Sequence, residues 1–207
     1  ALSESLAAYG NPDLQPETAK SYDVGLEQYL LGRRARIEAT LFRRNTRNLI
    51  TYSAATFMLE NVASARAEGV EVGIWLHPVP ALTVQAQYSL VDTENRSTAP
   101  DFSGNDNFGN WLARRARHSA SFSADWESPV GLAVGGTIVL VGDSFDDLAN
   151  NVPLDGYTLV DIRASYPVTE RIELYGRIEN LFDAGYETSF NYGSPGRAGY
   201  VGARLRF

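Results

Sequence analysis

The last residues of the chain, 197–207, alternate between apolar and polar side chains. Successive side chains of a strand point to opposite faces, so this segment predicts one strand with two unlike sides. Its apolar side ends on an aromatic residue and consists of Val201, Ala203, Leu205 and Phe207. Chain ends usually fray in water-soluble domains. A half-apolar strand at this position therefore predicts a closed membrane barrel, whose last strand must be paired and whose outer face meets lipid.

The same two-residue period recurs along the whole sequence, and no stretch shows a convincing helical period. It predicts nine strands, at 19–30, 34–51, 57–77, 81–92, 116–127, 131–142, 157–167, 170–181 and 197–207. Most reach the roughly 9–11 residues that a tilted membrane-spanning strand needs, whereas strands of ordinary globular domains average about 5–6. The predicted fold is all-β and antiparallel.

The predicted connections alternate in length. Short turns fall at 31–33, 78–80, 128–130 and 168–169, and longer connections at 53–56, 93–115, 143–156 and 182–196. Bacterial outer-membrane barrels have short periplasmic turns and longer extracellular loops, so this order favours a barrel over a soluble β-sandwich, the alternative fold. Counting back from a periplasmic C-terminus places every longer connection outside the cell.

Charged side chains in the middle of the predicted strands all fall opposite the apolar residues: Asp125, Asp161, Arg163, Glu173, Arg177, Glu179, Arg204 and Arg206. They fit either a water-filled or plugged barrel interior or the solvated face of an ordinary sheet. Nine is an odd number, and bacterial barrels have an even one. Because residues 1–18 read as a loop, the partner of the last strand is expected upstream, in a larger barrel of which this is the C-terminal piece.

Composition excludes several classes of protein. The chain has no cysteine, so it has neither disulfides nor thiolate metal sites, and its net charge of −7 argues against a nucleic-acid partner. The longest mostly apolar uncharged run, 129–142, is too short for a spanning helix. The two histidines, His77 and His118, are far apart, and no Gly-x-Ser-x-Gly or phosphate-binding loop is present. We therefore expect no metal site built on His or Cys and no cofactor, and the sequence shows no credible Ser–His–Asp set.

Several motifs occur in order along the chain. Gly-Asn-Pro-Asp-Leu-Gln-Pro-Glu-Thr at 10–18 precedes the first predicted strand, and Asn61-Val62 with Gly69-Val70-Glu71-Val72 opens the third. Asn180-Leu181-Phe182-Asp183 ends the eighth, and Tyr-Gly-Ser-Pro-Gly-Arg at 192–197 leads into the last. Together these motifs resemble the TonB-dependent outer-membrane receptors. Their proline, asparagine and glycine residues also shape turns, so we expect most of them to serve folding and insertion.

The resemblance implies a 22-stranded antiparallel barrel plugged by a separate domain, of which residues 1–207 supply the last nine strands. It also implies a transport receptor rather than an enzyme, in the outer membrane of a Gram-negative bacterium. Such a receptor binds a scarce, bulky nutrient at its outer face, and the TonB energy-transducing complex acts through the plug to drive uptake. A ferric siderophore or cobalamin is the expected ligand, and the ending 180–197 is most similar to cobalamin-type receptors. The terminal strand, with Val201, Ala203, Leu205 and Phe207, resembles the signal read by the barrel-assembly machinery. A passive porin or an outer-membrane barrel enzyme with a Ser–His pair remains an alternative.

Ligand contacts are expected on the longer connections, because aromatic and polar groups on loops over a rigid barrel suit binding. The candidates in the 93–115 connection are Asp101, Phe102, Asn105, Asp106, Asn107, Phe108, Asn110 and Trp111. Those in 143–156 are Phe145, Asp146, Asp147, Asn150 and Asn151, and those in the last connection are Tyr186, Phe190, Asn191 and Tyr192. The four aspartates Asp101, Asp106, Asp146 and Asp147 leave calcium open as a second possibility, although their spacing matches no helix–loop–helix site.

Overall fold

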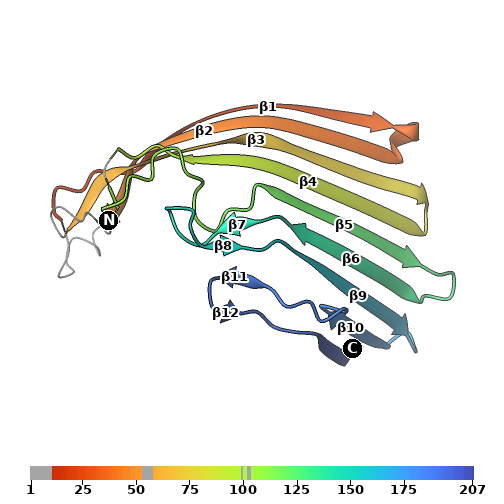
Figure 1. Cartoon of the computed structure of the whole chain (residues 1–207). Helices are drawn as coiled ribbons and strands as arrows, with labels where there is room; N and C mark the ends of the chain where they lie inside the picture. Colours follow the sequence, from red (N-terminus) through yellow and green to blue (C-terminus); the bar gives the residue numbers. More distant parts are fainter. Residues whose placement is uncertain (1–10, 53–57, 99, 102–103) are drawn as a thin grey trace.

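The computed structural model describes residues 11–52, 58–98, 100–101 and 104–207, so the candidate Phe102 and the whole predicted 53–56 connection lie outside it. Nine long strands form one antiparallel sheet in the order β1-β2-β3-β4-β5-β6-β9-β10-β13 (Figure 1). Their bounds are β1 Thr18–Leu30, β2 Ala35–Tyr52, β3 Leu59–Val79, β4 Leu82–Asn95, β5 His118–Glu127, β6 Ala133–Val141, β9 Tyr157–Pro167, β10 Ile172–Glu179 and β13 Ala198–Leu205.

Every long strand pairs with the next long strand along the chain, and β1 and β13 are the two open edges. The sheet is therefore a sector of a barrel rather than a closed one. The nine predicted strands, their antiparallel order and the all-β class are confirmed. Among the described residues, no helix is long and apolar enough to cross a membrane.

Most strand ends differ from prediction by one or two residues, and two of the differences change a connection. β3 continues through Pro78 to Val79, so the turn predicted at 78–80 lies instead at Pro80–Ala81. The pairing of β3 with β4 shifts between Leu76 and Val79, and a proline is tolerated at such an irregularity because no ladder hydrogen bond needs its missing N–H. β4 reaches Asn95, three residues further than predicted, and the connection to β5 is correspondingly shorter at that end.

Two connections predicted as loops contain short hairpins. β7 Ser144–Phe145 pairs with β8 Pro153–Leu154, and β11 Glu187–Ser189 pairs with β12 Tyr192–Gly193. Strands of two or three residues are too short to show an alternating pattern, which is why the sequence did not reveal them. In Figure 1 these hairpins lie at one end of the sheet, and the tight turns between β3 and β4 and between β5 and β6 lie at the other. We call the two ends the loop end and the turn end.

The register places uncharged, mostly apolar side chains on one face of the sheet. On β2, β3 and β4 this face carries Ile37, Ala39 and Leu41, then Val70, Val72 and Ile74, then Ala86, Tyr88 and Leu90. The pattern continues to β13, where Val201 is 92% exposed. Among the described residues only Ala35 and Leu154 form a buried apolar core. A broad, uncovered apolar face is rare on water-soluble monomers, and it fits a sheet whose outer side meets lipid.

The opposite face is polar, as the predicted mid-strand charges require. Asp125 and Arg163 lie on either side of Gly135 in the register, and their side chains pair across it, with Arg163 Nη2 2.5 Å from Asp125 Oδ1. On the last two strands Arg204 donates to Glu173 at 2.9 Å. The apolar face carries large aromatic residues near both ends of the sheet, as in the girdles of membrane barrels. Tyr88 lies toward the loop end, and Trp126 and Tyr166 lie toward the turn end.

Candidate functional site

Three connections at the loop end meet at Asp146. The Asp146 carboxylate accepts Arg114 Nε at 2.7 Å and Arg114 Nη2 at 3.3 Å, which joins the β7–β8 hairpin to the β4–β5 connection. The same Oδ1 accepts the backbone N–H of Phe190 at 3.1 Å, which adds the β11–β12 hairpin. One carboxylate therefore fixes the relative positions of loops that are far apart in the sequence.

Arg114 holds an unusual backbone conformation at this junction. Its φ is +57°, in the left-handed region that residues with a Cβ rarely adopt. Its backbone N–H donates to the carbonyl of Phe145 at 2.6 Å while its side chain binds Asp146. Backbone strain of this kind persists only where surrounding contacts enforce it, and it concentrates at functional sites.

Asn150 forms a second junction between the same two connections. Its Oδ1 accepts the backbone N–H of Trp111 at 2.8 Å, and its Nδ2 donates to the carbonyl of Trp111 at 3.1 Å. The Trp111 ring lies edge-on to Phe145, with ring centroids 5.8 Å apart. Trp111 is thus fixed in two ways: Asn150 bonds its backbone, and its ring packs against Phe145.

The electrostatics favour the charged form of Asp146. The side-chain hydrogen bond from Arg114 lowers the pKa of Asp146 below its usual value, and the bond from the Phe190 N–H lowers it further. The reciprocal effect raises the pKa of Arg114. Because both groups stay ionised at any physiological pH, the junction is a permanent ion pair with bidentate geometry.

The predicted acidic and amide candidates mostly build their own turns. Asp101 accepts the Asn105 N–H at 2.9 Å and Asn107 Nδ2 at 2.9 Å, and Asp106 accepts the Phe108 N–H at 3.0 Å. Asp147 accepts the backbone N–H groups of Asn151 and Val152 at 3.0 and 2.9 Å. Carboxylates used in this way have fewer lone pairs for a ligand. Among the described residues no group of three His, Cys, Asp or Glu side chains is placed to hold a metal ion.

The aromatic candidates are more available. Tyr192 is 73% exposed at the β11–β12 hairpin, and Phe190 beside it is also exposed. Phe108 is exposed and stacks against Arg96, whose guanidinium lies 4.8 Å from the ring centroid. Tyr186 packs against Tyr157 with ring centroids 4.5 Å apart. The exposed aromatic side chains, rather than the aspartates, remain the best candidates for ligand contact.

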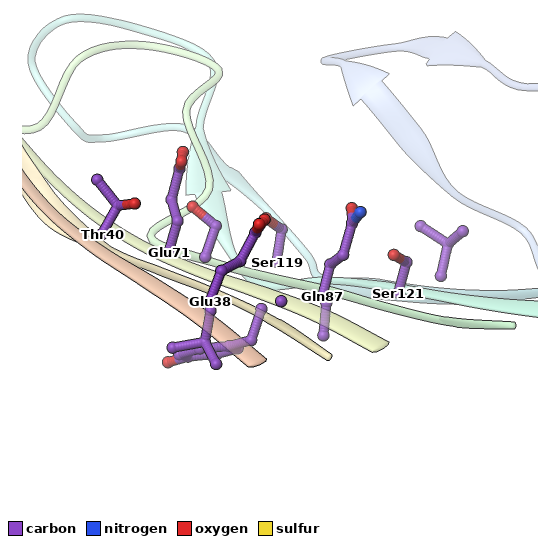
Figure 2. A pocket seen from close by; sticks show the side chains of 12 residues that line it. Glu38, Thr40, Glu71, Gln87, Ser119 and Ser121 are labelled. Atoms are coloured by element: carbon purple, nitrogen blue, oxygen red, sulfur yellow. The ribbon is translucent and has the colours of Figure 1, made fainter. Parts of the chain in front are cut away.

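The polar face below the loops is also hollowed. A depression of about 450 Å³ is lined by Glu38 and Thr40 from β2, Glu71 from β3, Gln87 and Ser89 from β4, and Ser119 and Ser121 from β5. Figure 2 shows the labelled side chains of this group standing on one side of the sheet. The depression offers hydroxyl, amide and carboxylate groups and, among its described lining residues, no basic side chain. It was not among the predicted sites, because residues from five strands, β2 to β6, gather there only through the register.

Three residues that matter at the loop end were missed from the sequence. Arg114 and Arg96 were not selected because a single arginine in a polar loop carries no distinguishing signal. Tyr157 begins a strand, where its alternation predicts only a strand position. The alternating pattern reveals none of these contacts, because Arg96 reaches Phe108 within its own connection, whereas the partners of Arg114 and Tyr157 lie on other connections.

The family-like motifs have structural roles. Asn61 Oδ1 accepts the Gln15 N–H at 2.7 Å and Asn61 Nδ2 donates to the Gln15 carbonyl at 2.8 Å, which ties the segment before β1 to β3. Asn180 is 5% exposed, and its side chain bonds both backbone groups of Ala184 (its N–H and C=O) and the carbonyl of Pro195. Asp183 Oδ1 accepts the Arg197 N–H at 2.8 Å. Asn180 and Asp183 therefore hold together the two ends of the last connection, as the structural interpretation of this motif anticipated.

Comparisons with known proteins agree with this architecture. The chain superimposes on the ferric-catecholate import receptor Fiu from E. coli K12 with a TM-score of 0.75 and 20% identity over 97% of the chain. It superimposes on the siderophore receptor PiuA from Acinetobacter baumannii (TM-score 0.78, 21% identity, 90% of the chain) and on the ferric yersiniabactin uptake receptor FyuA from Yersinia pestis (0.75, 20%, 92%). The chain covers only 29%, 28% and 30% of those three structures. The family model described as TonB dependent receptor-like, beta-barrel matches residues 2–181, so this chain belongs to the β-barrel family of the TonB-dependent receptors.

Proposed function

We propose that this chain is the C-terminal part of an outer-membrane receptor that binds a ferric siderophore at the loop end and imports it by TonB-driven transport. The observation that carries the proposal is the junction of three connections at Asp146, which presents exposed aromatic side chains over a rigid sheet. Such preorganised loops reduce the ordering that binding requires. In the proposal, a plug domain and the earlier strands precede residue 1.

The solved structures support a siderophore as the ligand, because the relatives named above are a ferric-catecholate import receptor, a siderophore receptor and a ferric yersiniabactin uptake receptor. Exposed aromatic rings such as Phe108, Phe190 and Tyr192 suit the flat, partly apolar faces of aromatic iron chelators. Cobalamin, favoured by the motif at 180–197, stays a prediction and serves as the comparison ligand below.

Placement in the outer membrane of a Gram-negative bacterium is part of the proposal, and the apolar face supports it. That face carries no charged side chain on the described strands between the turn end and Leu90 of β4. We further propose that the barrel-assembly machinery reads the terminal strand through Val201, Ala203, Leu205 and Phe207. The first three lie on the apolar face of β13, and replacing Phe207 by Ser should slow insertion of the full-length receptor without changing the stability of the inserted barrel.

The ligand proposal is tested by equilibrium binding to the purified full-length receptor. The probes are a ferric tris-catecholate, a ferric tris-hydroxamate and cyanocobalamin, followed by quenching of intrinsic fluorescence. Phe190→Ala should weaken binding of the preferred iron chelate by at least about fivefold, the minimum expected when a contacting aromatic side chain is removed. Phe182→Ala is the matched control, because Phe182 is an exposed phenylalanine at the base of the same connection. Tight binding of cyanocobalamin alone would replace the siderophore in the proposal, and binding of none of the three would overturn it.

A further inference from the structure

At the loop end, charged residues replace the apolar ones on the face that is apolar over the rest of the sheet. Arg43 follows Leu41 on β2, Arg66 and Glu68 precede Val70 on β3, and Glu94 follows Leu90 on β4, each in step with the apolar alternation. Arg96 comes directly after β4. We call Arg43, Arg66, Glu68, Glu94 and Arg96 the rim charges.

The rim charges form one connected network across three strands. Glu68 Oε2 lies 3.6 Å from Arg43 Nε and 3.9 Å from Arg66 Nε. Glu94 is bonded by Arg66 and also accepts Arg96 Nη1 at 2.7 Å. Asp92 stands on the same face opposite Glu68, but its charge is balanced by Arg117, whose Nε lies 3.4 Å from Asp92 Oδ1. The three arginines and two glutamates of the rim charges therefore leave an excess positive charge. Arg43 and Arg96 are its outer members, with side chains 53% and 44% exposed, so both guanidinium groups have N–H donors left for another acceptor.

The height of the network on the sheet is the second observation. Asp92 on β4 pairs with Glu68, and Leu82 near the start of β4 pairs with Trp126 of the turn-end aromatic group. With a rise of about 3.4 Å per residue and a tilt of about 45°, Asp92 stands roughly 24 Å above Leu82, close to the ~25 Å height of the apolar band of a membrane barrel. The rim charges therefore begin where the hydrocarbon layer ends.

We propose that the rim charges bind the phosphate-bearing headgroups of the lipids that surround the barrel at its outer side. A side chain on the lipid-facing side just above the hydrocarbon layer meets headgroups, and an arginine fork matches a phosphate in bidentate geometry. The glutamates hold the arginines in position across the strands. The inference rests on the membrane placement in the proposed function, and its surface adjoins the proposed siderophore site at Arg96, which stacks on Phe108.

The test measures lipid binding to the purified full-length receptor by native mass spectrometry in detergent micelles. The probes are a bisphosphorylated diglucosamine lipid, the same lipid after removal of its phosphates, and inorganic phosphate. The double variant R43Q/R96Q removes two charges and leaves Arg66 as a partner for both glutamates. The control R44Q/R177Q makes the same charge change on the opposite face, since Arg44 adjoins Arg43 and points to the polar side, and Arg177 pairs there with Glu179. Heat-modifiable gel migration establishes that each variant is a folded barrel.

The wild type and the R44Q/R177Q control should prefer the phosphorylated lipid over the dephosphorylated one. In the R43Q/R96Q variant, the ratio of the affinities for the phosphorylated and the dephosphorylated lipid should fall roughly 25-fold. Each arginine near a charged headgroup layer contributes about fivefold to that ratio. Equal affinities of wild type and R43Q/R96Q for the phosphorylated lipid would overturn the inference, as would an equal loss in the control. Inorganic phosphate that competes at the lipid's own affinity would also overturn it, by assigning the arginines to free phosphate. Siderophore binding to the wild-type receptor is measured separately. If it is observed while the lipid result fails, only the present inference is overturned and not the proposed function.

Discussion

Arg114 and Asp146 lie 32 residues apart in the sequence, on two different connections of the barrel. Two hydrogen bonds from the Arg114 guanidinium to the Asp146 carboxylate join these connections. The carboxylate also accepts the Phe190 N–H of a third connection. Loops that carry function normally vary in position and are the most mobile parts of a fold. Here the Asp146 carboxylate contacts three of them, with Asn150 as a second junction between two, so changes at Asp146 should alter the loop end.

Asp146→Asn should loosen the loop end without weakening the sheet. The amide loses the charge that attracts Arg114 and accepts the Phe190 N–H less strongly. Hydrogen–deuterium exchange of the full-length receptor should become faster in peptides covering 143–152 and 186–194 and stay unchanged in β3 and β4. Asp155→Asn, an exposed change on the same connection as β7 and β8, should leave both loop peptides as in the wild type. Equal effects of the two substitutions would show that Asp146 has no special role.

The pH dependence of the loop end follows from the lowered pKa of Asp146. A carboxyl group whose folded pKa is lowered contributes stability above its unfolded pKa and loses it as pH falls through the folded value. The unfolded value is about 3.9, so the arrangement should be constant from neutral pH down to about 5 and loosen only below about 4. Acrylamide quenching of Trp111, in a receptor whose other tryptophans are replaced by phenylalanine, reports this directly. A transition near pH 6 would contradict the assignment.

Asn180→Ala should destabilise the last connection. The buried side chain bonds both Ala184 and Pro195, and removing it leaves those backbone groups unpaired, at a cost of about 1–3 kcal/mol. Alanine also fits the φ of +49° at this position poorly. Asn191→Ala separates the two effects, because Asn191 has a φ of +63° but is exposed. The measurement is the urea dependence of unfolding of the folded receptor, and equal losses for the two variants would attribute the effect to backbone strain alone.

Gly135→Ala should separate the ion pair between Asp125 and Arg163. A Cβ at Gly135 would overlap the Asp125 carboxylate and approach Arg163 Nε to 2.9 Å, so the two side chains would have to move apart. Because the pair is nearly half exposed, we expect a loss of about 1 kcal/mol at most. Gly136→Ala is the control, since a Cβ there points to the apolar face and meets only the Asp161 carbonyl, at 3.5 Å. In an Asp125→Ala background the effect of Gly135→Ala should disappear; if it persists, crowding of the backbone and not the ion pair is responsible.

The sheet could be predicted from the sequence because its signal is local and repeated. Each long strand shows alternation over many residues, and Leu82–Leu90 or Ala120–Trp126 is sufficient to assign both the strand and its two faces. The short and long connections followed directly from the gaps between strands. The small hairpins were missed because β7 and β12 contain only two residues each.

The loop end was predicted less well, for a different physical reason. Composition correctly indicated the connections that carry aromatic and polar residues, but it could not show that Asp147 bonds its own turn while Asp146 bonds two other connections. The two aspartates are adjacent and chemically identical, and only the three-dimensional fold gives them different partners. The same holds for Arg114, whose partner lies on another hairpin.

In the proposed function, the loop end captures an iron chelate for energised import. The most direct measurement is uptake of a radiolabelled ferric siderophore by cells that carry the full-length receptor, with and without TonB. We compare the wild type with a variant in which Phe108, Phe190 and Tyr192 are all alanine. We expect TonB-dependent uptake by the wild type and loss of both binding and uptake in the triple variant, while the variant receptor is still inserted in the outer membrane. Undiminished uptake by the triple variant, or wild-type uptake that does not need TonB, would contradict it.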